Sequence, residues 1–309
     1  IGHDSVAAAS ISTCCRVSEV KVPQIWRTWL FAAAALLTIV VSLVGQPDLI
    51  TQLFILAPAV AILGLPHGAL DLPIAQALWP LDGWRGKLRF VGLYVCLALL
   101  VIAVWIVLPG TALYVFLFYS AFHFSGDWDG AGATLRFSGG VATVGAPALF
   151  QTGEVATLFG YLAPEPAAEL AALLLAVIAG ISLGIFVATI SLRPQLRNSA
   201  AGEQGIIWIA AACLTPLVYF VVYFCMLHSV RHFSNAFASL EDPHQGLRVA
   251  TLLSVVTVFA GLVGFIVLQG FKPELLEQSI LRIIFIGLAA LTVPHMILVD
   301  RFQRKLKQQ

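Results

Sequence analysis

The sequence predicts an all-α protein: a polytopic helical transmembrane bundle of about eight to ten membrane segments, some of them broken or kinked. Of the 309 residues, 60% are hydrophobic and only 11% are charged, and the mean hydropathy is +0.93. One water-soluble core of this length cannot bury so much apolar surface. The apolar residues also gather in runs of about 20, the length that a helix needs to cross a bilayer.

The apolar runs follow one another with short polar breaks between them. The breaks carry turn and charge signals, such as SGDWDG at 125–130 and EDPHQG at 241–246. No period of a repeat protein recurs, so we expect a polar N-terminal tail (1–26), one helical membrane domain (27–302) and a basic C-terminal tail (303–309). The runs lie at 27–45, 49–70, 88–108, 111–125, 136–151, 168–192, 205–238, 248–269 and 279–300.

Basic residues in the short loops predict the orientation of the bundle. Lys and Arg residues precede the first run and follow the second and the sixth, which indicates a cytoplasmic N-terminus. The basic tail RFQRKLKQQ also favours the cytoplasm, but nine simple crossings would place it outside. The run at 205–238 is too long for one ordinary span and contains Pro216, so we expect it to be broken or to cross twice.

Composition excludes several classes of partner. The formal net charge is +1 and no basic block occurs, so nucleic acid is not expected as a partner. The five cysteines show no CxxC spacing, so we expect neither a disulfide framework nor a zinc knuckle. Membrane lipid surrounds such a chain, and its substrates should come from the lipid.

Histidines are concentrated in the apolar runs. Of seven histidines, only His3 and His244 lie in a tail or loop. Polar groups in hydrocarbon are costly unless they find partners in the protein interior. Burying five imidazoles separately would require five sets of partners, so a common site is favoured. The five histidines are His67, His123, His228, His232 and His295.

The local motifs indicate a metal site. In HSVRH, helical periodicity places His228 and His232 on one face, close enough to bind one ion. In LPHGALD, Pro66 and Gly68 flank His67 and can interrupt a helix. An all-imidazole site suits iron, copper or zinc, and the sequence contains no HExxH motif of a zinc hydrolase.

Charged residues near these histidines allow two interpretations. Asp71 and Asp300 follow His67 and His295 by four and five positions, so each carboxylate is a candidate to accept an imidazole N–H and orient the ring. The same carboxylates could instead pair with Arg231, itself a costly intramembrane charge.

Aromatic side chains surround the histidine motifs. Such a lining fits a long unsaturated hydrocarbon, although lipid-facing aromatics are the ordinary alternative. The candidates for substrate binding are Tyr119, Phe122, Phe124 and Trp128 near His123, and Tyr223, Phe224 and Phe233 near HSVRH.

Four motifs together resemble a known family. PHGALD, FHF, HSVRHF and PHMILVD, in this order between about residues 60 and 302, resemble the Brp/Blh family of bacterial and archaeal β-carotene 15,15'-dioxygenases. The resemblance implies an iron(II)-dependent enzyme that cleaves the central double bond of β-carotene with O2, giving two molecules of all-trans-retinal. The domain 27–302 would then be catalytic. One departure is Leu72, where the family pattern often has a histidine.

The resemblance also implies the roles of the site residues. His67, His123, His228 and His232 would hold Fe(II), with no catalytic residue beyond these ligands. His295 matches a family motif without an assigned role. From the residues themselves, His295, Asp71, Asp300 and Arg231 are candidates for an additional ligand or for groups that orient the ligands. The implied location is the inner membrane of a bacterial or archaeal cell, with a functional link to a retinal-binding opsin.

Two other functions remain open at this point. One is a non-catalytic carrier of carotenoid or retinal, and the other is a haem-binding membrane electron-transfer protein. A rhodopsin-like retinal protein is disfavoured, because all five lysines fall in loops or tails.

Overall fold

The structure is a computed structural model that describes residues 25–307 apart from 80, 82, 241 and 272–274. The side chains of residues 67, 77 and 302–307 also lie outside the description. The predicted N-terminal tail therefore lies almost wholly outside the described residues, and the predicted C-terminal tail is described only as helical backbone up to Lys307. The described part of the chain is mostly helical and contains no strand, which confirms the all-α prediction.

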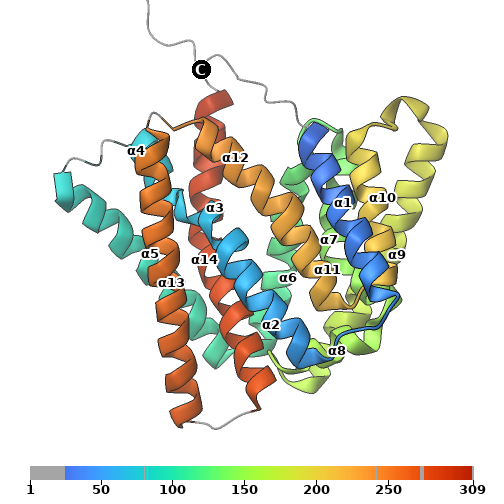
Figure 1. Ribbon diagram of the computed structural model, residues 1–309, viewed down its shortest axis with the longest axis horizontal. Coiled ribbons are helices and arrows are strands. Elements are labelled where there is room, and N and C mark those ends of the chain that lie inside the picture. The colour runs from blue at the N-terminus through green and yellow to red at the C-terminus, as the bar shows by residue number, and fades with distance from the viewer. Residues whose placement is uncertain (1–24, 80, 82, 241, 272–274, 308–309) are drawn as a thin grey trace, which may run out of the picture.

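Long helices alternate with short helices and single turns (Figure 1). In chain order the elements are α1 (Ile25–Ser42), α2 (Leu49–Ala59), the π-helical turn η1 (Val60–Gly64), α3 (Leu65–Ala69), α4 (Asp71–Leu78), α5 (Gly83–Val107), α6 (Pro109–Ser125), the 3-10 turn η2 (Gly126–Trp128), α7 (Ala133–Phe150), α8 (Thr152–Gly160), α9 (Glu165–Leu192), the 3-10 turn η3 (Pro194–Leu196), α10 (Ser199–Cys213), α11 (Pro216–Tyr223), the π-helical turn η4 (Phe224–Ser229), α12 (Val230–Ala238), α13 (Pro243–Phe271) and α14 (Leu276–Lys307).

Six helical stretches in the described residues are long and apolar enough to cross a membrane. They are α1, α5, α9, the continuous stretch α11–η4–α12, α13 and α14. This confirms a multi-pass helical membrane protein, but the number is lower than the predicted eight to ten. Two of the other apolar runs form shorter helices, since α6 has 17 residues and α10 has 15. Helix α7 has 18 residues but is not apolar enough to be among the six.

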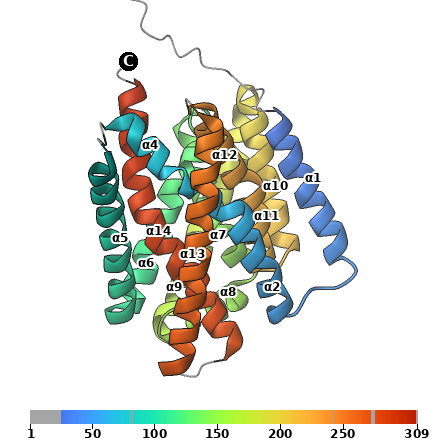
Figure 2. The ribbon, with the colours of Figure 1, turned by 60° about the vertical axis from the view of Figure 1, so that its left-hand side comes forward.

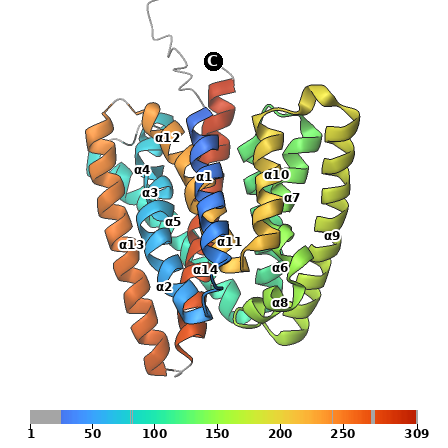
Figure 3. The same cartoon turned by 45° about the vertical axis from the view of Figure 1, so that its right-hand side comes forward.

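The long run at 205–238 is broken, as its length and proline predict. Helix α10 ends at Cys213, and α11 begins at Pro216 after Leu214 and Thr215 in extended conformations. Proline is well tolerated in the first turn of a helix, because its missing N–H would have no partner there. The two helices run in opposite directions, and α1 begins at the same end of the bundle at which α14 ends (Figures 1 and 3).

The helices form two groups with a seam between them. Helices α6, α7, α8, α9 and α10 pack on one side, while α3, α4, α5, α13 and α14 pack on the other (Figure 3). Helix α1 and the stretch α11–η4–α12 lie between the groups, against α10 and η1. Figure 2 shows the same arrangement with α5 and α1 at opposite edges. The buried core is largest along this seam, where α11 and η4 contribute most of their residues.

Two π-helical turns meet inside the bundle. The turn η1 packs on η4, and a Cβ atom at Gly64 would lie only 2.8 Å from the Phe224 ring. Single π-helical turns shift the register of the residues that follow them and are frequent at functional sites. Here η1 precedes the helix that carries His67, and η4 itself carries His228.

The close packing of α6 on α7 depends on Gly140. A Cβ atom there would collide with the Ala121 carbonyl oxygen and lie 2.8 Å from Ser125 Cβ. We expect Gly140→Ala to force the two helices apart and to lower the free energy of unfolding by about 1–3 kcal/mol. The measurement is thermal unfolding of the purified protein in detergent.

Gly184→Ala on α9 is the matched control, since no atom lies within 4 Å of the added methyl group. It should leave the melting temperature unchanged or raise it slightly, because alanine favours helix more than glycine does. Equal melting temperatures for the two variants would contradict the role assigned to Gly140.

Candidate metal centre

Four histidines from distant parts of the chain meet in the seam. His123 lies in the last turn of α6, His228 in η4, His232 in α12 and His295 in α14. The ring centroids of His228 and His232 are 4.4 Å apart, and that of His123 lies 4.9 Å from His228 and 5.8 Å from His232. The His295 ring lies 5.9 Å from His123. His67 lies on α3, and its side chain is outside the described part of the chain.

The nitrogen atoms of two of these rings converge. His123 Nε2 lies 3.2 Å from His228 Nε2. Two nitrogen ligands at about 2.1 Å from one metal ion stand roughly 3.0–3.4 Å apart in octahedral or tetrahedral geometry. The spacing therefore suits two ligands of a common ion, and the two rings are also packed edge to face.

A buried carboxylate, Asp127 in η2, completes the cluster. Its side chain is fully buried, and it accepts hydrogen bonds from Tyr223 Oη at 2.6 Å, His228 Nδ1 at 3.1 Å and His232 Nε2 at 3.2 Å. Sequence reasoning missed this residue because it assigned the SGDWDG stretch to a polar break. The one available signal was an acidic residue four positions after His123.

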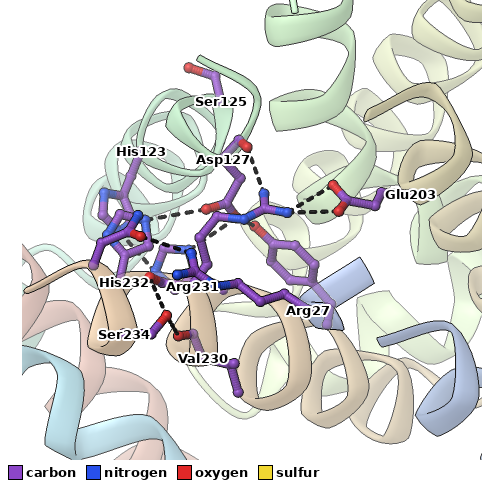
Figure 4. A network of polar contacts seen from close by, with 12 residues as sticks. Arg27, His123, Ser125, Asp127, Glu203, Val230, Arg231, His232 and Ser234 are labelled. Carbon is purple, nitrogen blue, oxygen red and sulfur yellow. Dashed lines mark hydrogen bonds and ion pairs between the residues drawn. The ribbon is translucent and has the colours of Figure 1, made fainter. Parts of the chain in front are cut away.

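An ion-pair network holds Asp127 from its other side (Figure 4). Arg231 donates to the Asp127 backbone carbonyl at 2.6 Å and to both Glu203 oxygens at 2.8 and 2.9 Å. Thr28 donates to Glu203 as well, at 2.6 Å. The network joins α1, η2, α10 and α12, so the position of Asp127 is fixed by four elements at once.

A second carboxylate orients His295. Asp71 Oδ1 lies 2.7 Å from His295 Nδ1, and Asp71 Oδ2 accepts a hydrogen bond from Tyr94 at 2.9 Å. An ionised carboxylate oxygen can only accept a hydrogen bond, so Nδ1 of His295 carries the proton in this contact. The sequence allowed Asp71 to pair either with a histidine or with Arg231. In the structure Asp71 pairs with His295, and Arg231 pairs with Glu203. Asp300 is exposed on α14.

An apolar cavity of about 360 Å³ reaches the histidines from one side. Its walls come from α3, α5, α6, α7, α8, α11, η4, α13 and α14, and His123, His228 and His295 form part of them. Among the aromatics predicted to bind substrate, Phe124, Tyr223 and Phe224 line this cavity. Tyr119, Phe122, Trp128 and Phe233 do not, and Phe122 is 53% exposed.

The donor set fits a transition metal. Asp127, His228 and His232 offer ligand atoms within 4.8 Å of one another, and His123 adjoins them. Imidazole suits iron, copper, nickel and zinc, and two histidines with one carboxylate form the donor combination of many non-haem Fe(II) oxygenases. The spacing of Asp127 from His228 and His232 in the sequence does not indicate this combination, because η2 and the histidines come together only in the folded chain.

Comparison with known proteins gives a consistent family. Residues 58–303 match the family model described as "BCD: Beta-carotene 15,15'-dioxygenase". A relative named "Beta-carotene 15,15'-dioxygenase", from an uncultured marine bacterium 66A03, is 34% identical over 252 residues, which cover 78% of this chain and 90% of the relative. No solved structure matches.

The buried pair Arg231–Glu203 gives a stability prediction. Its side chains are 16% and 4% exposed, so Glu203→Gln leaves a guanidinium largely buried without its counter-charge. Breaking such a pair costs about 3–5 kcal/mol of unfolding free energy. Thermal unfolding in detergent should show a clear fall in melting temperature.

Asp129→Asn is the matched control for this prediction. The Asp129–Arg136 pair is 36–39% exposed, and exposed pairs contribute about 0–1 kcal/mol. If both variants unfold at the same temperature, the Glu203 pair does not stabilise the seam in the way described.

Proposed function

The chain belongs to the β-carotene 15,15'-dioxygenase family, and from this membership we propose that it cleaves the central 15,15' double bond of β-carotene with O2 to give two molecules of all-trans-retinal. The observation that carries the proposal is the convergence of His123 and His228 nitrogens at the wall of an apolar cavity. The reaction would take place in the inner membrane, where its product could supply a retinal-binding opsin.

We propose that His67, His123, His228 and His232 hold Fe(II). Bound there, Fe(II) would supply the oxygen chemistry that amino-acid side chains lack. Asp127 acts as a positioning residue: by accepting the Nδ1–H of His228, it keeps Nε2 of that ring available and directed at His123. Asp71 fixes the ring of His295 in the same way, which makes His295 a candidate additional ligand.

The cavity would orient the polyene and exclude water. Phe224 stacks on His228 with ring centroids 5.6 Å apart, and Phe220 stacks on Phe224 at 5.0 Å. The three stacked rings line the cavity and lead to the candidate ligands. A conjugated chain can pack along this row of aromatic rings with its central double bond near His228. No acid or base is assigned a step, and no observation favours the carrier or haem alternatives.

The activity test uses a bacterium that makes β-carotene. Expression of the chain should bleach the orange colour as retinal appears, and purified protein should contain iron. His228→Ala should abolish both retinal formation and bound iron, because a ligand is removed. His244→Ala is the control, since His244 is exposed at the start of α13. Iron and retinal retained in His228→Ala would refute the ligand assignment.

A substitution can distinguish whether Asp127 positions a ligand or is itself a ligand. Asp127→Asn keeps the size of the side chain but weakens its acceptance from His228, so metal affinity should fall about 10–100-fold without vanishing. Titration of metal-free protein with Fe(II) under anaerobic conditions measures this. A complete loss of binding, equal to that of His228→Ala, would instead make Asp127 an essential ligand.

A further inference from the structure

A second cavity lies on the other side of the histidine cluster, and it differs in chemistry from the first. It has a volume of about 590 Å³, and polar side chains form much of its wall, among them Thr28, Asn198, Glu203 and Asn235. Asp127 and His232 form its inner end, and His295 lines both cavities. The candidate metal centre therefore separates an apolar chamber from a polar one, which we name the polar vestibule.

The polar vestibule opens at one end of the bundle. Asp129, Asn198, Ser199 and Ser239 line it and are exposed. They belong to the segment after η2, the start of α10 and the end of α12, which lie at the end of the bundle where α1 begins (Figure 1). At the inner end, the His232 side chain is 21% exposed, whereas those of His228 and Asp127 are 0% exposed. Among the members of the cluster that line this cavity, which are Asp127, His232 and His295, His232 is thus the most exposed.

A metal ion and a polyene, which differ in polarity, would both have to reach the proposed centre. A hydrated divalent cation pays a large desolvation cost in an apolar chamber, while a polyene gains nothing from a polar one. The apolar cavity offers aliphatic and aromatic walls and few oxygen atoms. Hydroxyl and amide oxygens in the vestibule, such as those of Ser199, Ser239 and Asn198, can replace the water ligands of a hard cation.

Carboxylates compensate two of the positive charges near the vestibule. Arg231 is held by both oxygens of Glu203, and Arg136 pairs with Asp129. Arg27 donates to Asn235 Oδ1 at 2.8 Å. The guanidinium of Arg231 is therefore compensated by a carboxylate, and the negative charge of Asp127 lies at the inner end beside His232 (Figure 4).

We propose that the polar vestibule is the access route by which a hydrated divalent metal ion reaches the centre, with His232 the first histidine it meets, while the carotenoid arrives through the apolar cavity. This inference rests on the proposed metal site. It assigns a transport role to residues that touch neither substrate nor metal in the finished centre, such as Ser239 and Ala236.

The test closes the vestibule after the protein has folded. Ser239→Cys is purified in metal-free form and labelled with a bulky maleimide, and the probe is Co(II), whose absorption bands report ligand binding. We expect labelled protein to take up Co(II) at least about tenfold more slowly than unlabelled protein, with the same final occupancy. Binding of β-carotene, followed by its absorption, should be unchanged.

Two controls make the result specific. Thr157→Cys, exposed on α8 beside the apolar cavity, should load Co(II) at the same rate with and without the label. The starting chain treated with the reagent accounts for its own cysteines. Ala236→Trp narrows the vestibule without chemical modification and should slow loading as the label does.

The outcomes separate this inference from the proposed function. Slow loading restricted to labelled Ser239→Cys and Ala236→Trp supports the vestibule as the route. Equal rates with and without the label, together with normal occupancy, overturn it and leave the metal site intact. If unlabelled protein shows no Co(II) bands at all, the metal site itself is wrong and the inference falls with it.

Discussion

The burial of the Asp127 carboxylate is the constraint on which the centre depends. A charge fully enclosed by a membrane protein is tolerated only when hydrogen bonds replace its lost hydration. Asp127 obtains three, from Tyr223, His228 and His232. The same bonds that stabilise the charge also fix which nitrogen of His228 faces His123. The same three hydrogen bonds therefore stabilise the Asp127 carboxylate and orient the candidate ligands.

This arrangement explains why the helices around the seam are irregular. A regular α-helix through 216–238 would repeat its side chains every 3.6 residues, and the π-helical turn η4 changes that register where His228 must point at η2. Gly64 in η1 leaves room for Phe224 in η4. The 3-10 turn η2 then carries Asp127 into the cluster directly after α6. Backbone irregularity is concentrated where polar side chains have to converge.

The sequence predicted the fold class, because apolar composition and run length leave clear signals. It also predicted a common site for five histidines, of which the structure brings together His123, His228, His232 and His295, while the His67 side chain lies outside the described residues. Apolar runs marked the helices, and the break near Pro216 followed from run length. Asp127 escaped prediction, since its function depends on contacts 96 to 105 residues away along the chain. The same holds for the pairing of Asp71 with His295, which are 224 residues apart. Short helices such as α8 were also missed, because its nine residues are too few for a membrane span and include Gly153 and Glu154 at the start.

The apolar cavity and the polar vestibule lie on opposite sides of the histidine cluster. The proposed centre would receive a lipid-soluble polyene from one side and a water-soluble cation from the other, so an apolar and a polar cavity would have to meet at it. On the side facing α10 and α1, Arg231 donates to the Asp127 backbone carbonyl and forms an ion pair with Glu203. The opposite side can then be lined by Phe124 and Phe224. The histidines lie at this boundary: His228 and His232 contact Asp127, His295 contacts Asp71, and His123 and His228 line the apolar cavity.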